Sequence, residues 1–193
     1  MDDRIKSAFE KAMERAGQMQ EVPAWELARA DNLPKGRMMA VRFLNGQDFD
    51  LAADLGRQDR SLRPYLAEGA RETFLLHIGL PADDEGREAN RRAMNGLVAT
   101  AADKGALAEA LGELEYLFDY YGKVLDSTYQ RLKANFSQRA AGAKRKAESR
   151  PGMTIDVARQ PAFLEEWSRT RAQLTAQFEE KLNEVKQAIR EIG

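Results

Sequence analysis

The chain has 193 residues, of which 30 are Lys or Arg and 31 are Asp or Glu, and it has no cysteine. This balance of charge excludes a general attraction of the whole chain to nucleic acids or anionic membranes, and the lack of cysteine excludes disulfides and thiolate chemistry. Acidic Asp2 and Asp3 follow Met1 where a leader peptide would be basic and apolar, and no stretch approaches the ~18 consecutive apolar residues of a membrane-spanning helix. We therefore expect a cytoplasmic protein without a membrane partner.

The N-terminal part of the chain shows short apolar periods separated by Pro, Gly and Asn. Residues 2–19 are expected to form a helix with an apolar face. That face consists of Ile5, Phe9, Ala12, Met13, Ala16 and Met19. A short helix is expected from Pro23, then a break at the sequence Asn-Leu-Pro-Lys-Gly of residues 32–36, and a second helix over residues 38–44.

Three more helices are expected before residue 103. A short one covers residues 49–55 and an amphipathic one residues 61–78. Acidic residues 83–85 supply the first turn of the next helix, where they complement its dipole. The sequence Asn95-Gly96 can end that helix early, because both residues tolerate a left-handed backbone.

Two apolar stripes in the second half of the chain predict a long helical hairpin. The first consists of Leu107, Leu111, Leu114, Phe118, Tyr121, Leu125, Thr128 and Leu132, and the second of Phe163, Trp167, Leu174, Phe178, Leu182, Val185, Ile189 and Ile192. Asp103 is expected to cap a helix of residues 104–147, roughly 65 Å long at 1.5 Å per residue, and Pro161 to begin the last helix. Between them, Pro151-Gly152 should end the first helix and the alternating apolar residues of 153–157 should run extended.

Antiparallel packing of this hairpin predicts which residues meet. The expected neighbours are Phe136 with Phe163 or Trp167, Leu125 with Leu174 or Phe178, and Ile189 and Ile192 with residues 107–114. The expected fold class is all-α, a helical bundle with a long, coiled-coil-like C-terminal hairpin packed against shorter N-terminal helices. Residues 1–103 would be the short-helix region and residues 104–193 the hairpin, together one continuous bundle.

An aromatic cluster widens the apolar face of the first hairpin helix. Tyr116, Phe118, Tyr120 and Tyr121 cover more of its circumference than one partner helix can bury. Two interpretations stay open: the N-terminal helices cover the cluster as core, or it is an exposed patch that captures another protein or a second copy of the chain. These four residues are therefore the candidate partner-binding site.

A basic segment follows at the end of the same helix. Its cations are Arg131, Lys133, Arg139, Lys144, Arg145, Lys146 and Arg150, against the single acid Glu148. They can complement the helix dipole, or they can contact the phosphates of an RNA or an acidic protein. Arg139, Lys144, Arg145, Lys146 and Arg150 are the candidate anion-binding residues. No aromatic residue interrupts residues 144–146, which favours backbone contact over base stacking.

The sequence contains no recognisable catalytic set. Its one histidine, His77, is expected to be a hydrogen-bonded structural residue, because a triad needs a nucleophile and an orienting group around it. Glu115 and Asp119 share a helix face, as expected for a solvated face or for ion pairs with a neighbouring helix. We predict no catalytic residue, no cofactor and no metal.

Two segments resemble parts of small helical bacterial proteins of unknown function. They are residues 115–121, Glu-Tyr-Leu-Phe-Asp-Tyr-Tyr, and residues 155–167, which begin Ile-Asp-Val-Ala-Arg-Gln-Pro and reach Trp167. The resemblance implies a cytoplasmic bacterial setting and an uncharacterised family, and it carries no activity and no functional residue.

The function expected from the sequence is that of a non-enzymatic interaction protein: an adaptor, chaperone or scaffold. Its partner would be a protein or a second copy of the chain, as a homodimer. The alternative is an RNA- or ribosome-associated factor that uses the basic segment of residues 131–150.

Overall fold

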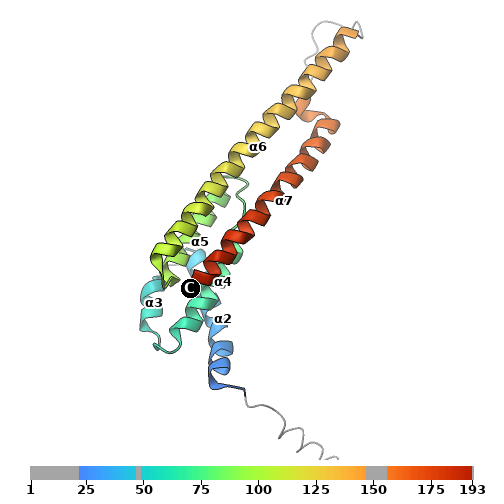
Figure 1. The fold of residues 1–193 in the computed structure, drawn as a ribbon. Coiled ribbons are helices and arrows are strands. Elements are labelled where there is room, and N and C mark those ends of the chain that lie inside the picture. The colour runs from blue at the N-terminus through green and yellow to red at the C-terminus, as the bar shows by residue number, and fades with distance from the viewer. Residues whose placement is uncertain (1–21, 47–48, 147–155, 193) are drawn as a thin grey trace, which may run out of the picture.

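The computed structural model describes residues 22–46, 49–146 and 156–192, without the side chains of residues 143–146. Over these ranges the protein is all-helical, as predicted (Figure 1). The helices are α2 (Ala24–Leu44), α3 (Leu51–Arg57), α4 (Arg63–His77), α5 (Asp84–Thr100), α6 (Lys104–Lys146), the 3-10 helix η1 (Val157–Arg159) and α7 (Pro161–Ile192). None of the helices in these ranges combines the length and apolar composition needed to span a membrane. The helix expected over residues 2–19 lies outside the described residues.

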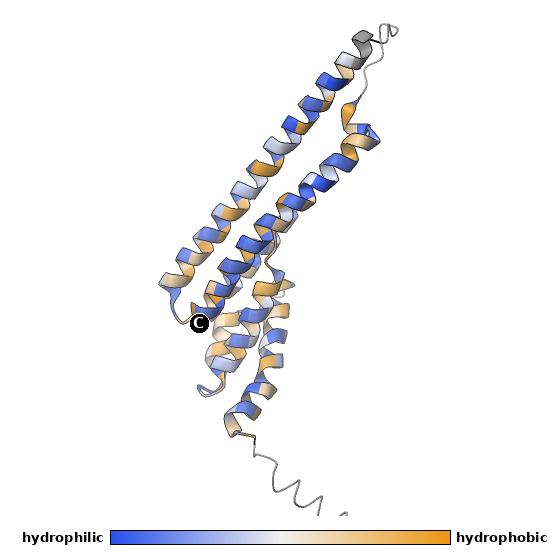
Figure 2. Cartoon of the chain, turned by 45° about the vertical axis from the view of Figure 1, so that its right-hand side comes forward, coloured by the Kyte–Doolittle hydropathy of each residue, from blue (hydrophilic) through white to orange (hydrophobic). Residues whose placement is uncertain are grey.

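The long helices α6 and α7 run antiparallel and form the arm of the molecule (Figure 1). Asp103 caps α6, since its carboxylate accepts hydrogen bonds from the N–H groups of Gly105 and Ala106 at 2.9 and 3.0 Å. Hydrophobic and hydrophilic residues alternate along both helices (Figure 2), the pattern of amphipathic helices that face each other. The helix boundaries expected at Asp103 and Pro161 are confirmed.

Aromatic contacts set the register of this hairpin. Near the turn, the rings of Phe136 and Phe163 meet edge to face at 5.5 Å between centroids, as predicted. Further along, Tyr121 contacts Phe178 at 5.1 Å, and its hydroxyl lies 2.9 Å from the hydroxyl of Thr175. The predicted antiparallel arrangement is therefore correct.

The shorter helices pack around one end of the hairpin, where α6 begins and α7 ends (Figure 1). Leu107 lies beside Ile189 and Ile192 there, as predicted, together with Leu97 of α5. The core of this end includes Leu66, Phe74, Leu75, Ile78, Leu97, Leu107, Leu114 and Ile189, all almost fully buried. The lower half of the hairpin is thus one wall of a helical bundle.

The predicted break at residues 32–36 is wrong, because α2 continues through Pro34 as one helix. Proline removes a backbone hydrogen bond from a helix interior, but tertiary packing on α4 holds the helix together. Gly36 lies directly against the backbone of Leu66, and Gly69 of α4 lies directly against the backbone of Leu33. The side-chain amide of Asn32 also donates to the carbonyl of Ala28 at 2.7 Å. These glycines mark a close helix crossing instead of a chain break.

Two smaller expectations also fail. Asn95-Gly96 does not shorten α5, which continues through both residues to Thr100. Gly96 lacks a side chain at the point where the ring of Phe74 packs directly against the helix. Val157 is buried at the start of η1 and not part of an extended segment. The other residues of the expected extended pattern, and Pro151-Gly152, lie outside the described residues.

Candidate partner-binding groove

The structure divides the four aromatic residues of the predicted partner-binding site. Phe118 and Tyr121 are buried in the bundle, at 5% and 3% exposure, and present no surface to a partner. Tyr116 and Tyr120 face solvent, at 73% and 51% exposure. Their rings stack in parallel at 6.1 Å between centroids. Phe118 and Tyr121 are therefore core residues, and Tyr116 and Tyr120 are the exposed part of the cluster.

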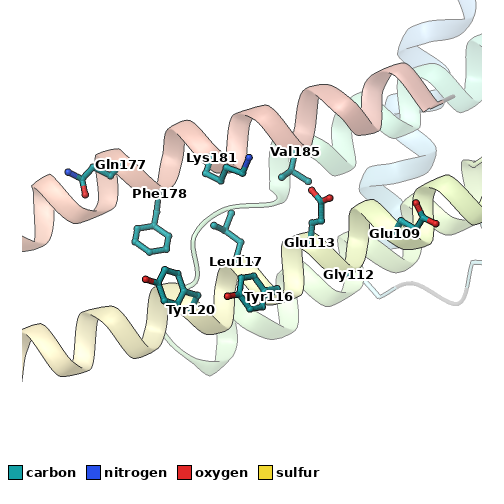
Figure 3. A pocket seen from close by; sticks show the side chains of 10 residues that line it. All are labelled: Glu109, Gly112, Glu113, Tyr116, Leu117, Tyr120, Gln177, Phe178, Lys181 and Val185. Atoms are coloured by element: carbon teal, nitrogen blue, oxygen red, sulfur yellow. The ribbon is translucent and has the colours of Figure 1, made fainter.

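Tyr116 and Tyr120 form one wall of a groove between α6 and α7 (Figure 3). We call it the aromatic groove, and its volume is about 800 Å³. The lining residues from α6 are Glu109, Gly112, Glu113, Tyr116, Leu117 and Tyr120, and those from α7 are Gln177, Phe178, Lys181 and Val185. The residues recur every three or four positions, so the groove follows the axis of the hairpin.

The shape of the groove follows from residue size on the two helices. At Gly112 the helix has no side chain, and a Cβ atom there would meet nothing within 4 Å. Phe178 of α7 reaches across to Tyr120, with 5.7 Å between ring centroids (Figure 3). Leu117 and Val185 are buried beneath. The groove is therefore an apolar floor with an aromatic wall and an open end at Gly112.

Charges are distributed unevenly around this floor. Lys181 Nζ lies 2.7 Å from the carboxylate of Glu184 on the same helix. That hydrogen bond raises the pKa of Lys181 above its ordinary value, and the charge of Glu113 adds to the effect. Glu109 and Glu113 stand one helical turn apart and are both exposed. Because Lys181 is held by Glu184, the α6 edge at Glu109 and Glu113 is acidic.

Arg139, the predicted anion-binding residue whose side chain the structure describes, lies far from this groove, toward the other end of α6. Arg131, Lys133 and Arg139 are exposed there, and the guanidinium of Arg139 lies 5.7 Å from the ring centroid of Phe136. The side chains of Lys144, Arg145 and Lys146, and the whole of Arg150, lie outside the described residues. The structure thus places one of the five candidates.

The residues considered as candidate catalytic groups lie in different parts of the molecule. His77 is exposed, and its Nδ1 lies within hydrogen-bonding distance, 2.9 Å, of the Thr73 carbonyl of its own helix. Asp119 accepts a hydrogen bond from Arg87 of α5 at 2.8 Å. Arg87, Asp119 and Glu115 all line a polar hollow of about 250 Å³ between α5 and α6. Glu115 and Asp119 therefore face α5, as expected for acids that pair with a neighbouring helix.

The chain belongs to a family of unknown function, DUF6657, whose model matches residues 52–191. No curated protein and no solved structure matches the chain. The matched range includes α6, all but the last residue of α7 and every residue of the aromatic groove, whereas α2 precedes it. The prediction of an uncharacterised family is confirmed.

The sequence predicted some of the residues that line the groove and missed others. Phe178 and Val185 belong to the apolar stripe of the last helix, from which we expected both to lie in the hairpin core. The sequence suggested no role for Lys181, and it suggested for Gly112 only that, like the other glycines of the long helix, it could permit close packing or local bending. The available signal was spacing: Gly112 lies four residues before Tyr116, on the same helix face, where a missing side chain leaves room.

Proposed function

We propose that the protein is a helical interaction protein whose aromatic groove binds an amphipathic helix of a partner protein. The observation that carries this proposal is the stacked, solvent-facing pair Tyr116 and Tyr120 above an apolar floor. Exposed apolar clusters of this kind are typical of interaction sites. Tyrosine is enriched among the residues that contribute most to binding, because it buries a large area at low entropic cost.

The form of the groove favours a helix as the occupant. From Glu109 to Tyr120 it extends over twelve residues of α6, roughly 18 Å at 1.5 Å per residue. This length accommodates three turns of a third helix laid between α6 and α7. Such a helix would place side chains at i, i+4 and i+7 into the space above Gly112 and beside Phe178. The resulting three-helix arrangement is the packing that helix bundles use.

The acidic edge indicates the chemistry of the partner. A helix in the groove would lie beside the carboxylates of Glu109 and Glu113, while Lys181 is held by Glu184. Complementary charge at the rim of an interface steers association and selects among partners. The partner helix should therefore carry Lys or Arg along one edge of its apolar face.

Synthetic helical peptides can stand in for the natural partner in a test of this proposal. One fluorescent helical peptide of 18 residues carries leucines at i, i+4 and i+7 and lysines beside them, and a matched peptide carries glutamates in place of the lysines. We expect saturable binding of the basic peptide, about threefold to tenfold tighter than the acidic one. The double variant Glu109→Lys, Glu113→Lys should abolish or reverse this preference.

Three outcomes would contradict the proposal. Neither peptide binds, or both bind equally well to the protein and to the double variant. The third outcome is a dimer of the protein in sedimentation experiments that becomes a monomer in the variants Tyr116→Ala and Tyr120→Ala. That result would show that a second copy of the chain occupies the groove. The exposed apolar residue Leu76 of α4 gives a matched control, since Leu76→Ala should change neither peptide binding nor the oligomeric state in sedimentation experiments.

A further inference from the structure

A second hollow lies on the arm of the molecule and shares no lining residue with the aromatic groove. Its volume is about 380 Å³, a size typical of small-molecule sites. Three parts of the chain contribute its walls: residues 81–87 at the start of α5, residues 122–129 of α6, and residues 167–171 near the beginning of α7. We call it the arm hollow.

Two aromatic rings form a corner in the arm hollow. Tyr129 of α6 and Trp167 of α7 meet nearly at right angles, with 75° between the ring planes and 5.1 Å between the centroids. The ring of Phe163, which is buried, also packs edge to face against Tyr129 at 5.6 Å, so the core of the arm holds Tyr129 in place. Tyr129 and Trp167 themselves are half-buried and line the hollow. Part of each ring is therefore open to a ligand.

The charges around this corner are mainly negative. The charged residues that line the hollow are Asp83, Asp84, Asp126, Arg87 and Arg171. The guanidinium of Arg87 is paired with Asp119 at 2.8 Å, so its charge is already balanced. Within the described part of the chain, Asp84, Asp126 and Arg171 make no ion pair. Three carboxylates against the one remaining guanidinium leave the hollow with a net negative charge.

This combination of groups is suited to an organic cation. The face of an aromatic ring attracts positive charge, and two or more rings around a methylated ammonium group are the usual means of recognising it. Nearby carboxylates add to the attraction. A metal ion would need several oxygen ligands directed at one point. In the described ranges, no three acidic or histidine side chains converge in that way.

We propose that the arm hollow binds a small organic ammonium ion, whose charged head lies in the corner of Tyr129 and Trp167 and beside Asp126. Asp126 precedes Tyr129 by three residues on the same face of α6, so one ligand head can contact both. Arg171 follows Trp167 by four residues on the same face of α7, and its charge opposes that of the ligand. The site functions independently of the aromatic groove and of any partner helix.

Choline and its uncharged isostere, in which carbon replaces the nitrogen, are the probes for this site. The chain has two tryptophans, so nitrogen–proton correlation spectra show one indole signal from the hollow and one from Trp25 of α2, which Trp25→Phe identifies. We expect choline to shift the Trp167 signal saturably below about 10 mM, without moving the Trp25 signal. The isostere should bind at least about fivefold more weakly. A Trp167 signal that does not saturate, or equal effects of the two probes, would overturn the proposal.

Three variants of exposed residues test the role of charge without disturbing the core. Asp126→Asn should weaken choline binding about threefold to tenfold, and Arg171→Gln should strengthen it about twofold, since it removes a repulsion. Glu166→Gln is the matched control, because it makes the same charge change next to Trp167 at a residue that does not line the hollow; it should bind choline like the unmodified protein. Unchanged binding in Asp126→Asn, or weaker binding in Arg171→Gln, would contradict the assignment of a cation.

Discussion

Gly36 of α2 packs directly against the backbone of Leu66 in α4, so a Cβ atom at residue 36 would overlap the Leu66 carbonyl oxygen. Gly69 makes the reciprocal contact with the backbone of Leu33. The two helices can approach this closely only where neither has a side chain. The crossing of α2 and α4 therefore depends on these two glycines.

Replacing Gly36 by alanine should separate the two helices. We expect Gly36→Ala to lower the free energy of unfolding by roughly 1–3 kcal/mol. The added methyl group would overlap the backbone of Leu66, which cannot move aside as a flexible side chain could. Urea denaturation measures the change. Gly142→Ala in α6, where a Cβ atom meets nothing within 4 Å, is the control and should not destabilise the protein.

Gly112 should respond in the opposite way. Gly112→Ala should raise the free energy of unfolding by about 0.5–1 kcal/mol, because alanine loses less conformational entropy than glycine in a helix and has open space here. The midpoint of urea denaturation should rise with an unchanged slope. A fall in stability would show that residue 112 packs against something and that the groove is not open at this point.

The hydroxyl of Tyr121 joins α6 to α7 within a mostly apolar contact. Its partner is the hydroxyl of Thr175 at 2.9 Å, and Tyr121 is buried. Tyr121→Phe should therefore cost roughly 0.5–1.5 kcal/mol of stability. The same change at the exposed Tyr120 should cost less, since water replaces any bond that is lost. Equal effects at both positions would argue against the register described for the hairpin.

The alternative of an RNA- or ribosome-associated factor makes a separate prediction. If the basic segment binds phosphates, retention of RNA should fall steeply with salt and weaken for all sequences alike when Lys144, Arg145 and Lys146 are changed to Glu. We expect no retention at physiological salt, because the proposed function uses the other end of the hairpin. Strong, salt-sensitive retention that the three changes abolish would favour the alternative.

The long-range periodicity of the sequence predicted the fold well. Apolar spacing, the cap at Asp103 and Pro161 located the hairpin, and counting from its turn placed Phe136 against Phe163. These features depend on local chemistry, which a sequence displays directly. Glycine and proline were misleading at residues 32–36 and at Gly96, because their role there is close packing against another helix. A sequence cannot show whether a glycine ends a helix or admits a neighbour.

The candidate site was only half predictable for a related reason. Helical spacing placed Phe118 and Tyr121 on the hairpin seam and Tyr116 and Tyr120 outside it. Which of them is buried depends on where α5 and α7 lie. The open space at Gly112 lies opposite residues of α7 that are more than sixty residues further along the chain, so no local pattern contains it.

The most direct test of the proposed function is to fill the groove without weakening the protein. Gly112→Leu places a side chain in the open space and improves helix propensity at the same time, and Gly142→Leu makes the same change on α6 outside the groove. Binding of the basic helical peptide is measured for both by fluorescence anisotropy. The proposal predicts that Gly112→Leu loses at least tenfold in affinity with unchanged or increased stability, while Gly142→Leu binds like the unmodified protein. Equal affinities for both variants would contradict it.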